Sequence, residues 1–272
     1  MRRFIPASIA AVFLGSIWTP STLLAQFLEP TKDELQMTAD EKAPGASAVY
    51  LYREDITERP TQFRTFYERI KVLTEKGKEL ATVEMPYDPA LEKIEVDGRT
   101  IHADGTIIPM VDKPAEVLDY KTRGFELDKL VFSLPSAEVG SILEYRVTVR
   151  YTFPPDEPTW EIQQSYFVHK AHYRYQFTGD SGISFGSRIE NGAKVENDHK
   201  GNCTLDVTDV PALPDDDWMP PLNTVTWRVW FFHSTDATPQ IFWDRVERSW
   251  AEFVREYTKT TGTLKKAASG MT

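Results

Sequence analysis

The chain has 272 residues, of which 26% are charged and 41% are hydrophobic, and its formal charge is −10. These values are typical of a folded protein and exclude a disordered chain. The acidic excess repels phosphate backbones, which argues against a nucleic-acid-binding protein. The one cysteine, Cys203, cannot form an intramolecular disulfide, so the core alone must stabilise the fold.

The first 25 residues have the pattern of a secretory signal peptide. Met1-Arg2-Arg3 supplies the positive start, Phe4–Trp18 is almost wholly apolar or small, and Ala25 is a small residue at the expected cleavage point. The alternative is an uncleaved membrane anchor, but the apolar run falls short of the ~20 residues of a spanning helix. We therefore expect an exported protein, periplasmic or extracellular, with no membrane span after cleavage.

A polar lead, residues 26–45, precedes a long series of strand patterns in residues 46–235. The clearest pattern is Ile142–Tyr151, in which every second residue from Leu143 onward is apolar and the residues between are polar. This alternation is typical of an antiparallel strand with one buried face and one solvent-exposed face. Looser alternation predicts further strands at Phe66–Val72, Trp160–Val168 and Val225–Phe231.

Turn signals separate the strand patterns. The dipeptides Asp97-Gly98, Asp104-Gly105 and Asn191-Gly192 tolerate positive φ and predict tight turns. No helix-period segment lies between the strands, so parallel βαβ units are not expected. The fold class we predict is mainly β, an antiparallel β-sandwich followed by a C-terminal amphipathic helix.

The pattern changes in residues 236–272. Thr238-Pro239 is a helix-start signal, and apolar residues then recur at helical spacing. A linker-like polar tail follows. The helix must cover its apolar stripe against the sandwich, a partner polypeptide or an adjoining domain. The stripe consists of Trp243, Val246, Trp250, Phe253 and Tyr257.

Three motifs carry a resemblance to a known family. They are Ala43–Leu51 (APGASAVYL), Arg99–Thr106 (RTIHADGT), and Phe132–Pro135 (FSLP) followed by Glu138–Tyr145 (EVGSILEY). Together they resemble the bacterial domain-of-unknown-function family, all-β and exported, that precedes transglutaminase-like domains. The resemblance runs from about residue 43 to beyond residue 222. It implies an all-β module without assigned catalytic residues, because the thiol–histidine–aspartate site of such proteins belongs to the domain that follows.

Cysteine, histidine and aspartate side chains are the candidates for chemistry in this chain. Cys203 lies on the apolar face of a strand, where burial raises a thiol's pKa, so we interpret it as structural and not as a nucleophile. His169 and His172 are three residues apart, and on a strand they point to opposite faces, which disfavours a shared metal ion. The run Asp215-Asp216-Asp217 lacks the ligand spacing of a calcium loop and is interpreted as solvated.

Three tryptophans could form a sugar-stacking platform: Trp218, Trp227 and Trp230. Trp227 and Trp230 differ in strand parity, however, so core packing is favoured. The sequence therefore predicts no catalytic, cofactor-binding or metal-binding residue and no cofactor. The function we expect is a non-catalytic module that binds or positions a partner polypeptide or an adjoining transglutaminase-like domain. The alternatives are the N-terminal part of a longer transglutaminase-like or cysteine peptidase enzyme, and a carbohydrate-binding sandwich.

Overall fold

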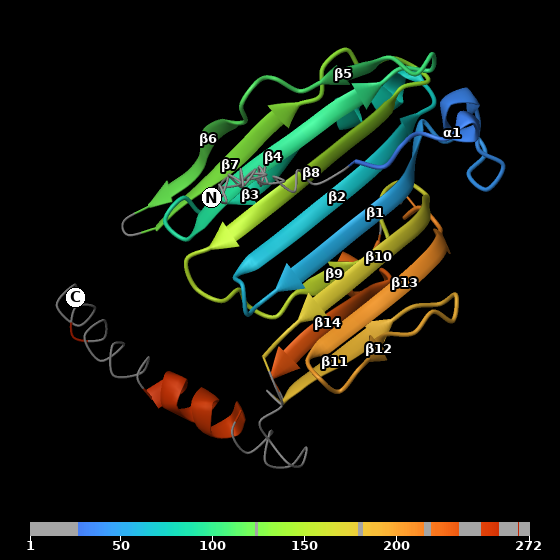
Figure 1. The fold of residues 1–272 in the computed structure, drawn as a ribbon. Coiled ribbons are helices and arrows are strands. Elements are labelled where there is room, and N and C mark those ends of the chain that lie inside the picture. Colours follow the sequence, from blue (N-terminus) through green and yellow to red (C-terminus); the bar gives the residue numbers. More distant parts are fainter. Residues whose placement is uncertain are drawn as a thin grey trace, which may run out of the picture.

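The computed structural model describes residues 27–122, 125–178, 182–214, 219–233, 246–255 and 266. The predicted signal peptide, the run Asp215–Asp217 and the ends of the predicted C-terminal helix lie outside these ranges. Figure 1 shows one large twisted sheet with two small sheets behind it. Within the described ranges, no helix is long and apolar enough to cross a membrane.

The large sheet has eight strands in the described residues. In spatial order they are β12 (Glu196–Asn197), β13 (Asn202–Val210), β10 (Val168–Gln176), β1 (Ala48–Glu58), β2 (Phe63–Val72), β8 (Ile142–Tyr151), β4 (Glu92–Ile101) and β5 (Ile107–Pro109). One small sheet has the order β11 (Ile183–Arg188), β14 (Arg228–His233) and β9 (Thr159–Glu161). The other has the order β3 (Thr82–Tyr87), β7 (Phe125–Ser133) and β6 (Ala115–Thr122).

Helices are few in the described residues. The α-helix α1 (Lys32–Gln36) precedes β1, and two 3-10 helices, η1 (Glu75–Ala81) and η2 (Leu222–Thr224), lie between strands. A further α-helix, residues 246–255, follows β14 and is called the C-terminal helix below. This arrangement confirms the predicted mainly β fold with a sandwich and a helix after it.

One strand pair departs from the predicted antiparallel pattern. β1 and β10 are neighbours in the centre of the large sheet and run parallel, with Tyr50 opposite Val168. A parallel pair needs a long connection. Here the connection is residues 59–167, which contain β2 to β9 and contribute β3, β6, β7 and β9 to the two small sheets. All other strand pairs in the described residues are antiparallel.

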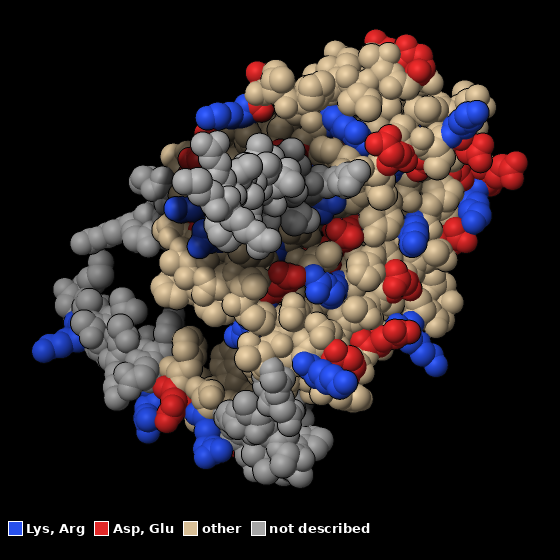
Figure 2. Space-filling view, in the orientation of Figure 1, with Lys and Arg blue, Asp and Glu red and all other residues tan. Residues whose placement is uncertain are grey.

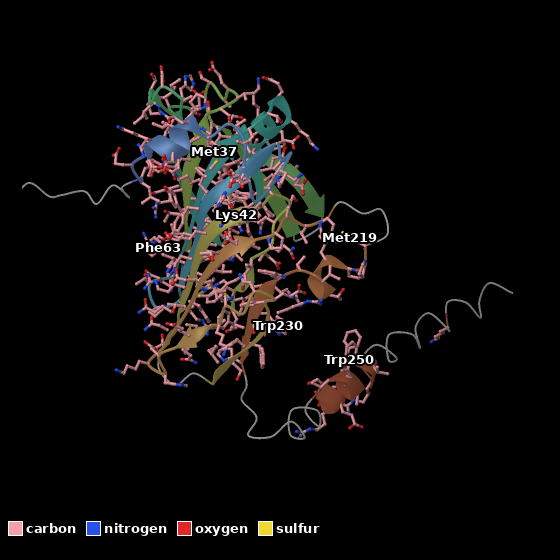
Figure 3. All side chains as sticks on the ribbon, turned by 90° about the vertical axis from the view of Figure 1, so that its right-hand side faces the viewer. Met37, Lys42, Phe63, Met219, Trp230 and Trp250 are labelled. Atoms are coloured by element: carbon pink, nitrogen blue, oxygen red, sulfur yellow. The ribbon has the colours of Figure 1, made fainter. Side chains whose placement is uncertain are left out.

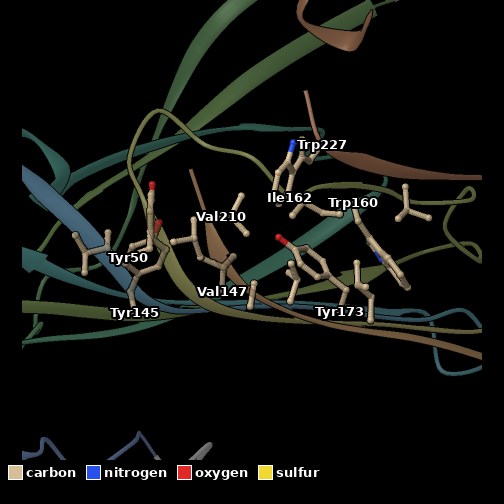
Figure 4. Close-up of a cluster of buried hydrophobic side chains, with 14 of the residues drawn as sticks. Tyr50, Tyr145, Val147, Trp160, Ile162, Tyr173, Val210 and Trp227 are labelled. Atoms are coloured by element: carbon tan, nitrogen blue, oxygen red, sulfur yellow. The ribbon is translucent and has the colours of Figure 1, made fainter. Parts of the chain in front are cut away.

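Aromatic side chains fill the space between the large sheet and the two small ones. Phe132 of β7 meets Tyr145 of β8 edge to face, with ring centroids 5.4 Å apart. Under the other small sheet, the ring of Trp160 lies 5.5 Å from Tyr173 and 4.7 Å from Phe231. Figure 4 shows Trp160 and Tyr173 pointing into the same buried layer. This layer is the core of the sandwich, and one hydrophobic cluster contains all five residues.

A β-bulge in β1 changes which side chains face this core. The register shifts between Tyr50 and Tyr52, so Arg53 and the residues at every second position after it turn toward the core side. Arg53 is then opposite Glu68 of β2, and its Nη2 lies 2.8 Å from the Glu68 carboxylate. The core side of the large sheet therefore carries a paired charge as well as apolar residues.

Two local predictions from the sequence are wrong, and each has a physical reason. Asp97-Gly98 does not form a turn but lies inside β4, where a Cβ on Gly98 would sit 2.6 Å from Leu134 Cδ2. The glycine permits this close packing. The pattern Trp160–Val168 is not one strand, because only β9 and the start of β10 are extended and paired. The turn at Asp104-Gly105 is confirmed, with Gly105 at φ +88°.

Candidate functional site

A buried charged cluster lies on the face of the large sheet that points away from the core, called the outer face below. Arg69 of β2, Glu144 of β8 and Arg99 of β4 are directly opposite one another on three neighbouring strands. Glu144 accepts from Arg69 Nη1 at 2.5 Å and from Arg99 Nε at 2.6 Å, and the Tyr67 hydroxyl also donates to it. Its side chain is 0% exposed, so the expectation of a solvent-exposed outer face is wrong here.

The N-terminal strap, residues 27–36, explains this burial because it crosses the outer face. The Leu28 carbonyl accepts from Arg69 Nη1 at 3.0 Å and from Arg99 Nη2 at 2.7 Å. The ring of Phe27 is 6.2 Å from that of Tyr67, and the Arg99 guanidinium lies 4.8 Å from the Phe27 centroid. Two guanidinium groups thus hold a backbone carbonyl and an aromatic side chain of the strap above Glu144.

The helix α1 inside the strap adds a second attachment. Thr31 caps the helix and forms a reciprocal capping box with Glu34. The Glu34 carboxylate also lies 3.0 Å from Arg69 Nη2. Burial favours the neutral acid, but the hydrogen bonds from Arg69 and Thr31 prevail and lower the pKa of Glu34. Glu34 therefore links the helix cap to the buried cluster.

Lys71 of β2 is the third cation of the sheet under the strap. Its Nζ donates to the Leu35 carbonyl at 3.0 Å and to the Gly140 carbonyl at 2.6 Å. Its side chain is fully buried, and burial lowers its pKa to about 8. Both hydrogen-bond partners are backbone oxygens, so Lys71 joins the strap to the turn before β8.

A pocket of about 400 Å³ remains on the outer face beside the strap. Arg146 of β8 stacks 4.7 Å from the centroid of Tyr67, and its Nη1 is 3.6 Å from Glu54. Arg146 Nε is buried and has no hydrogen-bond partner among the described residues. The lining of the pocket therefore combines two tyrosine rings with cations and carboxylates, and it includes Tyr52, Tyr67, Arg146, Lys170, Glu34 and Glu54. Figure 2 shows acidic and basic side chains interspersed over the visible parts of this face.

Cys203 lies in β13, opposite Tyr175 of β10, and is 1% exposed. Burial, assisted by the negative charge of Asp198, raises the pKa of its thiol to about 11. The environment is the opposite of the one that activates a nucleophilic cysteine. The structural interpretation of Cys203 agrees with this position.

We expect the thiol of native Cys203 to react with a disulfide reagent at pH 8 at least about 100-fold more slowly than the thiol of the unfolded chain. A rise of the pKa from its ordinary value of 9.0 to about 11 reduces the thiolate fraction by this factor, and burial slows access further. Stopped-flow labelling with and without denaturant measures the ratio. Equal rates in the two states would contradict the buried position.

The two histidines of the H-x-x-H pattern lie on β10 and pair with different acids. His169 contacts the buried carboxylate of Asp40, whereas His172 Nδ1 lies 3.1 Å from Asp206. The two imidazoles therefore do not share a partner. Among the described residues, no group of three or more histidine, cysteine, aspartate and glutamate side chains could hold a metal ion.

The tryptophans expected in the strand region occupy separate places. Trp227 is 6% exposed and belongs to the core. Trp230 lies under the Arg228 guanidinium, 4.9 Å from its ring centroid, and covers Gly186, which has no Cβ to obstruct it. Trp218 lies outside the described residues. Trp227 and Trp230 therefore do not form a shared, exposed platform for stacking a sugar.

The C-terminal helix carries large exposed apolar side chains. Trp250 is 62% exposed, and its ring meets Phe253 edge to face with centroids 5.8 Å apart. Val246, another member of the predicted stripe, is half-buried, while Trp243 and Tyr257 lie outside the described residues. Figures 1 and 3 show this helix apart from the sheets.

The comparisons with known proteins agree with the resemblance of the sequence motifs. Residues 60–214, more than half of the chain, match the family described as a domain of unknown function with a solved structure, DUF3857. The chain belongs to this family. No curated protein matches it.

A solved structure shares the DUF3857 chain's fold. It is the crystal structure of a putative protease from Parabacteroides distasonis ATCC 8503, with a TM-score of 0.60 and 15% sequence identity. The match covers 70% of this chain and 41% of that one. The chain thus corresponds to less than half of the length of the protein it resembles.

Two of the three motifs that carry the family resemblance meet in the buried cluster. Arg99 comes from the second motif, and Glu144 and Gly140 come from the third. Gly140 adopts φ +89°, a conformation that favours glycine, and its carbonyl accepts from Lys71. Sequence reasoning missed the roles of Arg69 and Lys71 because polar residues alternating along a strand read as solvent-exposed until the strap is placed over them.

Proposed function

We propose that this DUF3857 chain is a non-catalytic exported module that positions an adjoining transglutaminase-like domain, with the C-terminal helix as the contact. The observation that carries the proposal is Trp250, whose side chain is 62% exposed on a helix that follows the last strand of the sandwich. Tryptophan is the residue type most enriched among energetically dominant interface contacts. Burying such a ring removes a large apolar area from water and contributes about 2–3 kcal/mol.

The putative protease that shares the fold supports an adjoining domain as the occupant. Its chain extends well beyond the matched part, since the match covers only 41% of it. The family resemblance further supports a transglutaminase-like domain as the partner that follows the module. Export rests on the leader pattern of residues 1–25, and catalysis is assigned to the adjoining domain.

The chemistry of the described residues supports a non-catalytic role for the module itself. The thiol of Cys203 is buried with its pKa raised to about 11. Glu144, Arg69 and Arg99 are engaged with one another and with the strap. The hydrogen bonds of Glu144, Arg69 and Arg99 therefore stabilise the fold. Trp227 cannot contribute to a sugar-stacking platform, because its ring is buried in the core.

The coding DNA beyond the codon for Thr272 separates the adjoining-domain proposal from a separate partner polypeptide. We expect an in-frame continuation that encodes a cysteine on a helix, followed by histidine and aspartate. The chain would then be the front part of a longer transglutaminase-like or cysteine peptidase enzyme, with this module as its positioning half. A stop codon would contradict an adjoining domain and would leave a separate polypeptide as the partner.

A further inference from the structure

Two cations face each other on the outer face, far from the strap. Lys93 of β4 and Arg150 of β8 are directly opposite in the antiparallel register, and both are exposed. Side chains in such positions have Cβ atoms roughly 4.5–5.5 Å apart, and like charges there destabilise the sheet. The arrangement is unexpected in a chain with 41 acidic and 31 basic residues, where acids are the more available neighbours.

Neither cation has an ion-pair partner in the part of the chain that the structure describes. Within the described residues, the ion pairs include neither Lys93 nor Arg150. On the far side of Arg150 the neighbour in β2 is Phe63, and the guanidinium lies 5.8 Å from the centroid of this ring. The acid beyond Phe63 is Glu58, which is already held by Arg174 at 2.5 Å.

A pocket of about 260 Å³ opens between these cations. It is lined by Gln62, Lys93, Arg150, Tyr151 and Thr152. The side chains of Gln62, Lys93, Arg150 and Thr152 carry N–H or O–H donors, and none of the lining residues carries a carboxylate. The Tyr151 hydroxyl is engaged with Arg64. The backbone carbonyl of Gln62 accepts a hydrogen bond from the backbone N–H of Tyr151 at 2.9 Å, which holds Gln62 beside the pocket. Gln62 adopts φ +62°. The lining therefore favours an anionic ligand that accepts hydrogen bonds.

We propose that this pocket, the Lys93–Arg150 pocket, binds a phosphoryl group. A phosphate monoester carries a charge of about −1.5 to −2 near pH 7 and therefore neutralises both cations. A monocarboxylate neutralises only one of them. The guanidinium of Arg150 can bind two phosphate oxygens through its planar fork, while the ammonium of Lys93 acts as a point charge. This inference is independent of the proposed contact through the C-terminal helix.

Calorimetric titration of the full chain with inorganic phosphate, and with acetate at equal ionic strength, tests the proposal. We expect phosphate to bind the unmodified chain and acetate to bind at least tenfold more weakly. The double variant Lys93→Gln, Arg150→Gln should lose at least tenfold in phosphate affinity. The control variant Lys113→Gln, Lys194→Gln removes the same charge at two exposed lysines and should bind as the unmodified chain does.

Thermal unfolding supplies a second readout that separates a site from general charge attraction. In phosphate-free buffer the Lys93→Gln, Arg150→Gln variant should melt at a higher temperature than the unmodified chain, because the opposed charges are gone. Added phosphate should raise the melting temperature of the unmodified chain and of the control variant, but not that of the double variant. Absence of phosphate binding to the unmodified chain, or equal loss of affinity in both variants, would overturn the proposal.

The phosphoryl group can come from a soluble ester or from a lipid headgroup. Titration with glycerol 3-phosphate tests the first source, and co-sedimentation with phosphatidylcholine vesicles containing phosphatidic acid tests the second. In each arm, binding that is lost in the Lys93→Gln, Arg150→Gln variant and kept in the control supports the pocket and identifies the source. Binding that the double variant retains in both arms would overturn it.

Discussion

Replacing Glu144 by alanine is expected to lower the free energy of unfolding by about 3–5 kcal/mol. The carboxylate is fully buried and accepts hydrogen bonds from Arg69, Arg99 and Tyr67. Removing one partner of a buried ion pair leaves the other charges desolvated and uncompensated, which is the costly case. Arg69, whose side chain is 1% exposed, would lose its buried carboxylate and keep Glu34 as its remaining ion-pair partner.

Urea unfolding monitored by tryptophan fluorescence measures the Glu144→Ala effect. The matched control is Glu95→Ala, which removes an exposed acid from the outer face of β4 and is expected to change stability by less than about 0.5 kcal/mol. Hydrogen exchange in residues 27–36 should also accelerate in Glu144→Ala, because the arginines that hold the Leu28 carbonyl lose their anchor. A loss below about 1 kcal/mol would contradict the buried cluster.

Replacing Trp160 by alanine is expected to cost about 3–5 kcal/mol of unfolding free energy. The side chain is 0% exposed and lies against Tyr173 and Phe231, so its removal opens a cavity between the large sheet and β14. Trp160→Phe should cost less, because it keeps an aromatic ring and gives up an indole N–H that has no hydrogen-bond partner among the described residues.

Trp250→Ala provides the contrast within the same chain. It removes a side chain of the same size from an exposed position, so it should leave the stability of the isolated chain within about 0.5 kcal/mol of its original value. Chemical denaturation of the three variants in parallel gives the comparison. If Trp250→Ala destabilised the chain as much as Trp160→Ala, the C-terminal helix would be packed on the sandwich.

The sequence predicts the core side of the fold well, because burial there follows the two-residue period of a strand. The pattern of Ile142–Tyr151 gave the bounds of β8, and Val147 and Val149 lie in the core as expected. The bulge at Leu51 shows the limit of this reasoning. One inserted residue reverses the alternation in the second half of β1, and nothing in its composition marks the insertion.

The sequence predicts burial on the outer face less well, because burial there depends on residues that are far apart along the chain. Glu144 is polar in an alternating strand, and its burial depends on partners 45 and 75 residues away in the sequence, Arg99 and Arg69. The strap that covers it lies further still toward the N-terminus. The cross-strand opposition of Lys93 and Arg150 likewise requires the register of β4 and β8. Local patterns give a residue's face, but only the pairing of strands gives its neighbours.

The most direct test of the proposed function is the binding of the adjoining domain to this chain. The adjoining domain that we propose would be produced separately and titrated calorimetrically into the chain, into Trp250→Ala and into the control Glu252→Ala, an exposed residue of the same helix. We predict that the unmodified chain and the Glu252→Ala variant bind equally, and that Trp250→Ala binds at least tenfold more weakly. Equal binding by Trp250→Ala, or no binding by the unmodified chain, would contradict the proposal that the C-terminal helix positions this domain.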